Sequence, residues 1–121
     1  MFDLTRAYAR EHAESWCGAW NDRDLEAVMS HYAEDVAFCS PTVVKRWAIG
    51  DGWLQGKARL RENFAIGMES PTLHFDLVEV LTGVGSMCII YRRESGQLVA
   101  DTVELDDDGK GVRVLACYAD M

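Results

Sequence analysis

The chain has 121 residues, and its 49% hydrophobic content is enough for the core of one domain. Twenty Asp and Glu residues outnumber twelve Lys and Arg residues, which gives a net charge of -8 that nucleic acid and anionic membranes would repel. Because no apolar run approaches the roughly 18 residues of a membrane span, and because the N-terminal segment is too polar for a signal peptide, we expect one cytoplasmic domain over residues 1–121.

The first predicted element is a helix that begins after Asp3 or Thr5, either of which can cap it. Its apolar residues recur at helical spacing as far as Trp16 and Trp20. A polar break at 21–24 separates this helix from the next.

A short second helix follows the break. Its apolar residues stand at i, i+3, i+4 and i+7 and so share one face: Leu25, Val28, Met29 and Tyr32. The run from 36 to 39 then predicts a strand, which Ser40 and Pro41 close.

Residues 41–56 lose their periodicity, although they carry Trp47 and Trp53. We expect an irregular loop that serves as a lid over a pocket, as a cover for a sheet edge or as part of a dimer contact. Gly56 and Lys57 open a third helix, which ends near Pro71.

The last fifty residues predict four strands in an antiparallel meander, over 72–81, 86–93, 97–105 and 112–118. The run from Met87 to Tyr91 is apolar on both faces, which indicates that both faces of this strand are covered. The fold class is therefore α+β, with helices packed on one face of a sheet.

A recurring pattern begins with Trp16, Trp20-Asn21, Asp24-Leu25, Val28-Met29, Tyr32-Ala33, Asp35-Val36, Phe38 and Ser40-Pro41. It continues through Gly56-Lys57, His74-Phe75, Tyr91-Arg92 and Asp108-Gly109-Lys110 to Tyr118. In this pattern nearly the whole chain resembles the NTF2-like superfamily, in its SnoaL-like and ketosteroid-isomerase-like branch. The resemblance implies three N-terminal helices on a curved antiparallel sheet, which forms a cone-shaped half-barrel around an apolar cavity. It also implies a homodimer through the outer face of the sheet.

Such a cavity predicts a small hydrophobic molecule as the ligand. The residues expected to bind it are Trp16, Trp20, Tyr32, Phe38, Ser40, Trp53, Phe64 and Tyr118. The large aromatic residues among them are equally typical of an ordinary core, and in a fold with a cavity the core residues are its walls.

Asp101 is the first candidate catalytic residue. It shares a strand face with Val99, Val103 and Leu105, so its carboxyl group is expected to point inward. A buried carboxyl group must be paired or its pKa rises, and a protonated acid can donate a hydrogen bond to a developing oxyanion. The alternative is a structural carboxylate that accepts hydrogen bonds from Trp16, Tyr32 or Tyr118.

The resemblance places Asp101 at the position of the catalytic acid of steroid isomerases. In those enzymes a tyrosine on the first helix and an aspartate before the proline complete the site, whereas Trp16 and Ser40 stand at these positions here. An indole can only donate and a serine hydroxyl is a weak base. We therefore do not expect the familiar steroid isomerase mechanism.

His74 is the second candidate acid or base. We expect it on the first strand of the meander, on the face of Asp76, Val78 and Val80, where a structural role is the alternative. The four cysteines form no C-x-x-C pair and are expected to be free thiols in the core, and the histidines show no metal-binding spacing. No metal and no cofactor are predicted.

Two functions fit these residues. One is a cofactor-free isomerase, cyclase or lyase that acts on a carbonyl compound, with Asp101 as the acid or base and Trp16 or Tyr118 orienting the oxygen. The other is a non-catalytic ligand-binding or dimerisation module in which Asp101 is structural.

Overall fold

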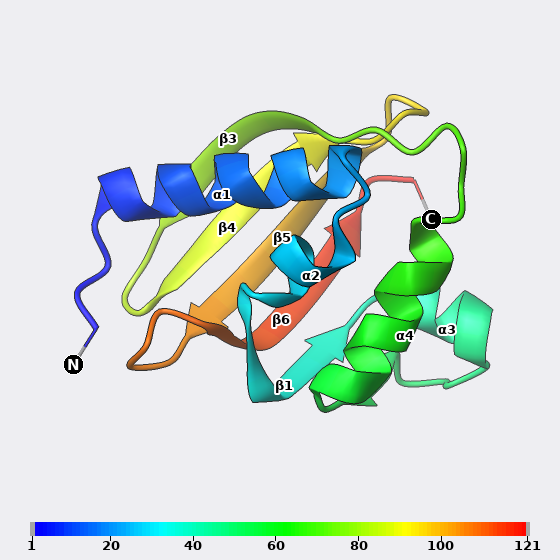
Figure 1. Ribbon diagram of the computed structural model, residues 1–121, viewed down its shortest axis with the longest axis horizontal. Coiled ribbons are helices and arrows are strands. Elements are labelled where there is room, and N and C mark those ends of the chain that lie inside the picture. The colour runs from blue at the N-terminus through cyan, green and yellow to red at the C-terminus, as the bar shows by residue number, and fades with distance from the viewer. Residues whose placement is uncertain (1, 121) are drawn as a thin grey trace.

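Four helices and six strands make up the described part of the chain, residues 2–120 of the computed structural model (Figure 1). Their bounds, in chain order, are α1 Arg6–Asn21, α2 Leu25–Met29, β1 Tyr32–Cys39, α3 Pro41–Trp47, β2 Trp53–Gln55, α4 Lys57–Gly67, β3 Asp76–Thr82, β4 Ser86–Arg92, β5 Leu98–Leu105 and β6 Gly111–Tyr118. The α+β class is confirmed, but the predicted number of three helices is wrong.

The extra helix is α3, in the segment predicted to be irregular. Ser40 caps it, since its Oγ accepts a hydrogen bond from the Thr42 backbone N–H at 3.2 Å, and Pro41 occupies the first turn. Proline suits this position because its missing N–H would have no partner there and its fixed φ is helical. Ala48, with a φ of 55°, ends the helix. The same segment also contains β2, in which Leu54 pairs antiparallel with Phe38.

The six strands form one curved, open sheet in the order β2-β1-β6-β5-β4-β3. All neighbouring pairs are antiparallel except β1 and β6, which run parallel. The predicted meander is confirmed in β3 to β6. Its first strand begins at Asp76, however, so the prediction that His74 lies on a strand is wrong.

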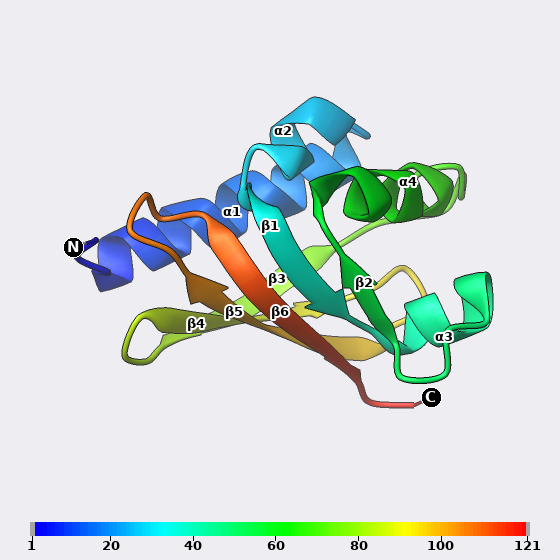
Figure 2. The same ribbon diagram turned by 90° about the horizontal axis from the view of Figure 1, so that it is seen from below.

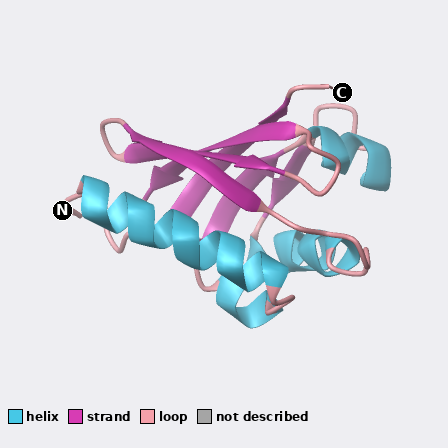
Figure 3. Cartoon of the chain, turned by 90° about the horizontal axis from the view of Figure 1, so that it is seen from above, coloured by secondary structure: helices cyan, strands magenta, loops and turns pink. Residues whose placement is uncertain are grey.

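Helices α1, α2 and α4 cover one face of the sheet, and α3 lies beside one end of it (Figures 2 and 3). The core fills the space between this helix layer and the concave sheet. Helix α1 contributes Ala9, Ala13, Trp16 and Trp20, all buried, and the last three lie on the stripe predicted from spacing. Within residues 2–120, no helix covers the opposite face of the sheet.

The strand phases agree with the sequence patterns. In β4, Met87, Ile89 and Tyr91 point into the core, while Cys88 and Ile90 alternate with them and are only partly buried. The four cysteines are free, as expected, but only Cys17 is fully buried. The prediction of core thiols is therefore wrong for Cys39, Cys88 and Cys117, because strand alternation turns them to the outer face. None of the helices among residues 2–120 is long and apolar enough to span a membrane.

Candidate functional site

A cavity of about 150 Å³ lies between the helix layer and the concave face of the sheet. Aromatic side chains form a large part of its walls, and several polar and charged side chains complete them. The aromatic lining residues are Trp16, Trp20, Phe38, Phe64, Phe75, Tyr91 and Tyr118, and the main polar ones are Arg46, Asn63, Arg93 and Asp101.

The aromatic rings form a continuous packed wall. Phe75 lies at its centre, with ring centroids 4.6 Å from Tyr91, 5.1 Å from Trp20 and 5.6 Å from Trp16. Trp20 also packs edge-on against Phe64 at 4.9 Å. Offset and edge-on contacts at these distances are favourable, so the wall is held in place by its own packing.

Asp101 is the acidic group of the cavity. The residue is 3% exposed, and the Tyr91 hydroxyl donates to its Oδ1 at 3.5 Å, the outer limit of a hydrogen bond. Burial raises the pKa of the Asp101 carboxyl to about 7, although the Tyr91 hydrogen bond and the Arg93 charge both lower it. Both protonation states of Asp101 are therefore accessible near neutral pH.

The predicted hydrogen-bond donors to Asp101 were the wrong ones. The Trp16 indole N–H donates to the Tyr32 hydroxyl at 2.8 Å instead, and Tyr91 is the donor to Asp101. This N–H is the sole polar hydrogen of the Trp16 side chain, so Trp16 supplies an apolar wall and no second donor.

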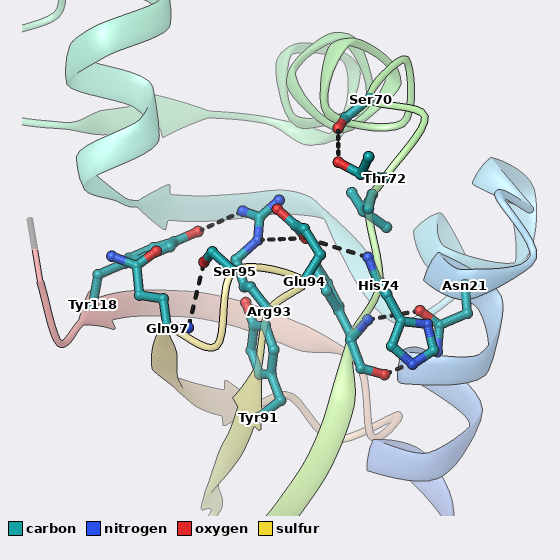
Figure 4. A network of polar contacts seen from close by, with 12 residues as sticks. Asn21, Ser70, Thr72, His74, Tyr91, Arg93, Glu94, Ser95, Gln97 and Tyr118 are labelled. Atoms are coloured by element: carbon teal, nitrogen blue, oxygen red, sulfur yellow. Dashed lines mark hydrogen bonds and ion pairs between the residues drawn. The ribbon is translucent and has the colours of Figure 1, made fainter.

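Two arginines lie at the outer end of the cavity. Arg93 donates to the Tyr118 hydroxyl at 3.4 Å and to Glu94 at 3.5 Å, as the network in Figure 4 shows, and its guanidinium lies 5.2 Å from the Phe75 ring centroid. Arg46, in the last turn of α3, donates to Asn63 twice, to its backbone oxygen at 3.0 Å and to its Oδ1 at 2.8 Å. Helix α3 thus carries a positive charge to the edge of the site.

Six of the ten residues predicted for the site line this cavity. They are Trp16, Trp20, Phe38, Phe64, Asp101 and Tyr118. They come from α1, β1, α4, β5 and β6, and strand and helix periodicity placed all of them on inward faces.

The structure places the other four elsewhere. Tyr32 lies behind the wall, bonded to Trp16, and Ser40 caps α3. Trp53 lies under the Arg113 guanidinium, 5.1 Å from it. His74 is exposed before β3 and its Nε2 lies 2.9 Å from Asp76 Oδ1, so the structure does not bring it to Asp101.

The sequence interpretation missed the other lining residues, among them Arg46, Asn63, Phe75 and Tyr91. Tyr91 could have been found, because it shares the inward phase of Met87 and Ile89. Arg46 and Asn63 could not, because they meet only when α3 forms and packs beside α4. Arg93 was not predicted as a site residue either. Within residues 2–120, no group of three or more His, Cys, Asp or Glu side chains is placed to hold a metal ion.

A curved sheet that holds an aromatic cavity against a layer of helices defines the NTF2-like class of proteins. The model of the SnoaL-like domain matches residues 13–119, nearly the whole chain. The chain therefore belongs to the SnoaL-like family, within the NTF2-like superfamily.

Solved structures agree with this assignment. A SnoaL-like protein of unknown function from Burkholderia thailandensis E264 is 34% identical, with a TM-score of 0.92 over 96% of this chain and 98% of that one. A candidate isomerase of the SnoaL-like family from Agrobacterium tumefaciens C58 is 17% identical, with a TM-score of 0.70 over 92% of this chain and 97% of that one.

A third solved structure carries a described chemistry. SalBIII, an epoxide hydrolase/cyclase-like enzyme in pyran ring formation in the polyether salinomycin, is 15% identical, with a TM-score of 0.73 over 94% of this chain and 92% of that one. At such identities the last two structures show a shared fold alone. No curated protein is similar enough to count as a match.

Proposed function

We propose that this protein binds a small carbonyl compound in the cavity and catalyses a cofactor-free isomerisation, cyclisation or elimination by proton transfer through Asp101. The observation that carries the proposal is a carboxyl group in the wall of an aromatic cavity, 3% exposed and held by one long hydrogen bond. A carboxyl so weakly held is free to exchange its proton with a ligand.

The electrostatics of Asp101 support proton transfer. A general acid or base works best when its pKa lies near the working pH, and burial brings the pKa of Asp101 to about 7. The Tyr118 hydroxyl, which also lines the cavity, accepts a hydrogen bond from Arg93, and because burial raises its pKa it stays protonated and can donate to a ligand oxygen. Tyr118 therefore takes the orienting role, which Trp16 cannot fill because its N–H is bonded to Tyr32.

The cavity limits the size of the substrate. An apolar cavity of about 150 Å³ holds a molecule of the size of benzene, and this cavity has a volume of about 150 Å³. The enclosed space is enough for one ring but not for the whole of a fused four-ring steroid. Together with the structural roles of Trp16 and Ser40, this size argues against steroid isomerisation.

The test measures proton transfer directly. One-ring ketones in deuterated buffer at pH 7 are followed by NMR for exchange of the hydrogen next to the carbonyl group. We expect the wild type to accelerate exchange and Asp101→Asn to lower the acceleration by about 100-fold, within the usual contribution of a general acid or base. Asp107→Asn, which changes an exposed aspartate in the β5–β6 turn, is the matched control and should leave exchange unchanged.

The non-catalytic alternative rests on one observation. Among residues 2–120, Tyr91 is the one side chain hydrogen-bonded to Asp101, so no second acid or base touches it. If the wild type binds a ketone without accelerating exchange, the catalytic proposal fails and the protein is a ligand-binding module. If Asp101→Asn keeps full exchange, the role proposed for Asp101 is wrong.

A further inference from the structure

Two guanidinium groups lie at the outer end of the cavity. Arg46 is bonded to two uncharged oxygens of Asn63, and the charge of Glu69 acts on it without forming a salt bridge among residues 2–120. Arg93 is paired with Glu94, but at 3.5 Å, and its side chain is only 19% exposed. The guanidinium of Arg46 therefore has no ion-pair partner within the described part of the chain.

This local charge is opposite to that of the molecule. The chain as a whole has a net charge of -8, so a positive cavity mouth is not an average property of its surface. Both arginines are also held in position, Arg46 by Asn63 and Arg93 by Tyr118 and the face of the Phe75 ring. A guanidinium that is already oriented loses little freedom when it binds a planar carboxylate.

The inner end of the same cavity holds one carboxyl group among apolar aromatic rings. Asp101 lies there, and an anion placed beside it would be repelled whenever Asp101 is ionised. The aromatic rings of Trp16, Trp20 and Phe75 offer faces for a flat apolar body. A ligand with one anionic group therefore has a single favourable direction, with its charge outward and its ring inward.

We propose that the natural ligand is a one-ring carboxylic acid, whose carboxylate binds Arg93 and Arg46 and whose ring lies in the aromatic cavity with its far end toward Asp101. This proposal rests on the proposed function for the use of the cavity, and it adds the chemical class of the ligand. It also fixes the reacting carbonyl at the end of the ring opposite the carboxylate, because that end meets Asp101.

Benzoate and benzamide are the probes, since they share a ring and a planar substituent and differ in charge. Binding is followed by quenching of tryptophan fluorescence at pH 7.5. We expect benzoate to bind at least about tenfold more tightly than benzamide. Because the difference is ionic, added salt should weaken benzoate binding and leave benzamide binding unchanged.

Two arginine variants locate the charge that is responsible. Arg93→Met should lower benzoate affinity by about tenfold or more and spare benzamide. Arg113→Met is the matched control, because Arg113 also lies over an aromatic ring, Trp53, and pairs with a glutamate, Glu104, but does so away from the cavity. It should leave the affinities for both probes unchanged. Arg46→Met, at the exposed end of α3, should act in the same direction as Arg93→Met.

Equal binding of the two probes, or tighter binding of benzamide, would overturn the carboxylate class while leaving the Asp101 exchange experiment intact. The carboxylate class would also be overturned if Arg113→Met weakens benzoate binding as much as Arg93→Met does. If neither probe binds, the inference fails, whereas the proposed function is decided separately by the exchange of ketone hydrogens. If benzoate binds more tightly than benzamide and Arg93→Met abolishes this difference, the result would support a carboxylic acid as the ligand.

Discussion

Asp101 shows how far a single residue can be understood from strand alternation. Its inward direction follows from the alternating apolar residues Val99 and Val103, and the structure confirms it. The identity of its partner could not be predicted, because Tyr91 reaches it from the neighbouring strand and that contact depends on the register of β4 against β5.

The pKa of Asp101 leads to a prediction on stability. The folded-state value of about 7 lies above the ordinary value of 3.8, so the folded protein binds this proton more tightly than the unfolded chain does. Stability from this group is therefore greatest below pH 3.8 and falls as pH rises to about 7. Asp101→Asn removes the penalty, so the variant should be more stable than wild type at pH 8, by about 2–4 kcal/mol.

Chemical denaturation of both proteins at pH 5 and pH 8 measures this. The stability that Asp101→Asn gains over the wild type should be smaller at pH 5 than at pH 8. Burial lowers the pKa of His12 to about 3, so both proteins lose stability from this group as pH falls. The difference between the two proteins at each pH removes this shared effect and leaves the effect of Asp101. A variant less stable than wild type at pH 8 would mean that Asp101 is an ionised structural acceptor.

At the scale of elements, helix α3 was the main feature that the sequence did not predict. Seven residues are too few to show a helical period, and only Val43 among them is buried. Ser40 and Pro41 fit the end of the predicted strand, but the same two residues are also a typical helix start. The longer elements were found because each repeats its apolar pattern several times.

Asn63 holds α3 against α4. The residue is 2% exposed, and its Oδ1 accepts hydrogen bonds from both Arg46 at 2.8 Å and the Trp47 indole at 3.0 Å. Asn63→Ala leaves these donors without their acceptor, so we expect a loss of about 1–3 kcal/mol in the free energy of unfolding. Asn63→Asp keeps the acceptor and pairs it with Arg46.

Urea denaturation of the two variants tests this assignment. Asn63→Asp should retain more stability than Asn63→Ala. Should Asn63→Ala cost no more than about 0.5 kcal/mol, the level of an ordinary surface change, the contact would not hold α3 in place.

At the scale of the whole molecule, the outer face of the sheet stands without a helix. Its central strands present mostly apolar or uncharged residues, which are Cys88, Ile90, Leu98, Ala100, Thr102, Leu115 and Cys117. Arg113 and Glu104 neutralise each other on this face at 2.9 Å. In a chain of net charge -8, copies repel one another least here.

We propose that a second copy of the chain covers this face, as the apolar pattern of β4 predicts. Sedimentation at micromolar concentration should give about twice the chain mass of 13.6 kDa. Ile90→Glu, which puts a charge at the centre of the face, should give the monomer. Val84→Glu, in the fully exposed β3–β4 turn, should remain dimeric. A monomeric wild type would contradict the proposal.

The parallel pairing of β1 with β6 has a consequence for how the chain acquires its fold. Strand β6 lies between β1 and β5, so the first 110 residues contain two separate pieces of sheet, β2-β1 and β5-β4-β3, and no strand to join them. During synthesis the inner edges of both pieces stay unpaired until β6 emerges, and unpaired edges invite pairing with other chains. The sheet that encloses the cavity can therefore close only after β6 has been made.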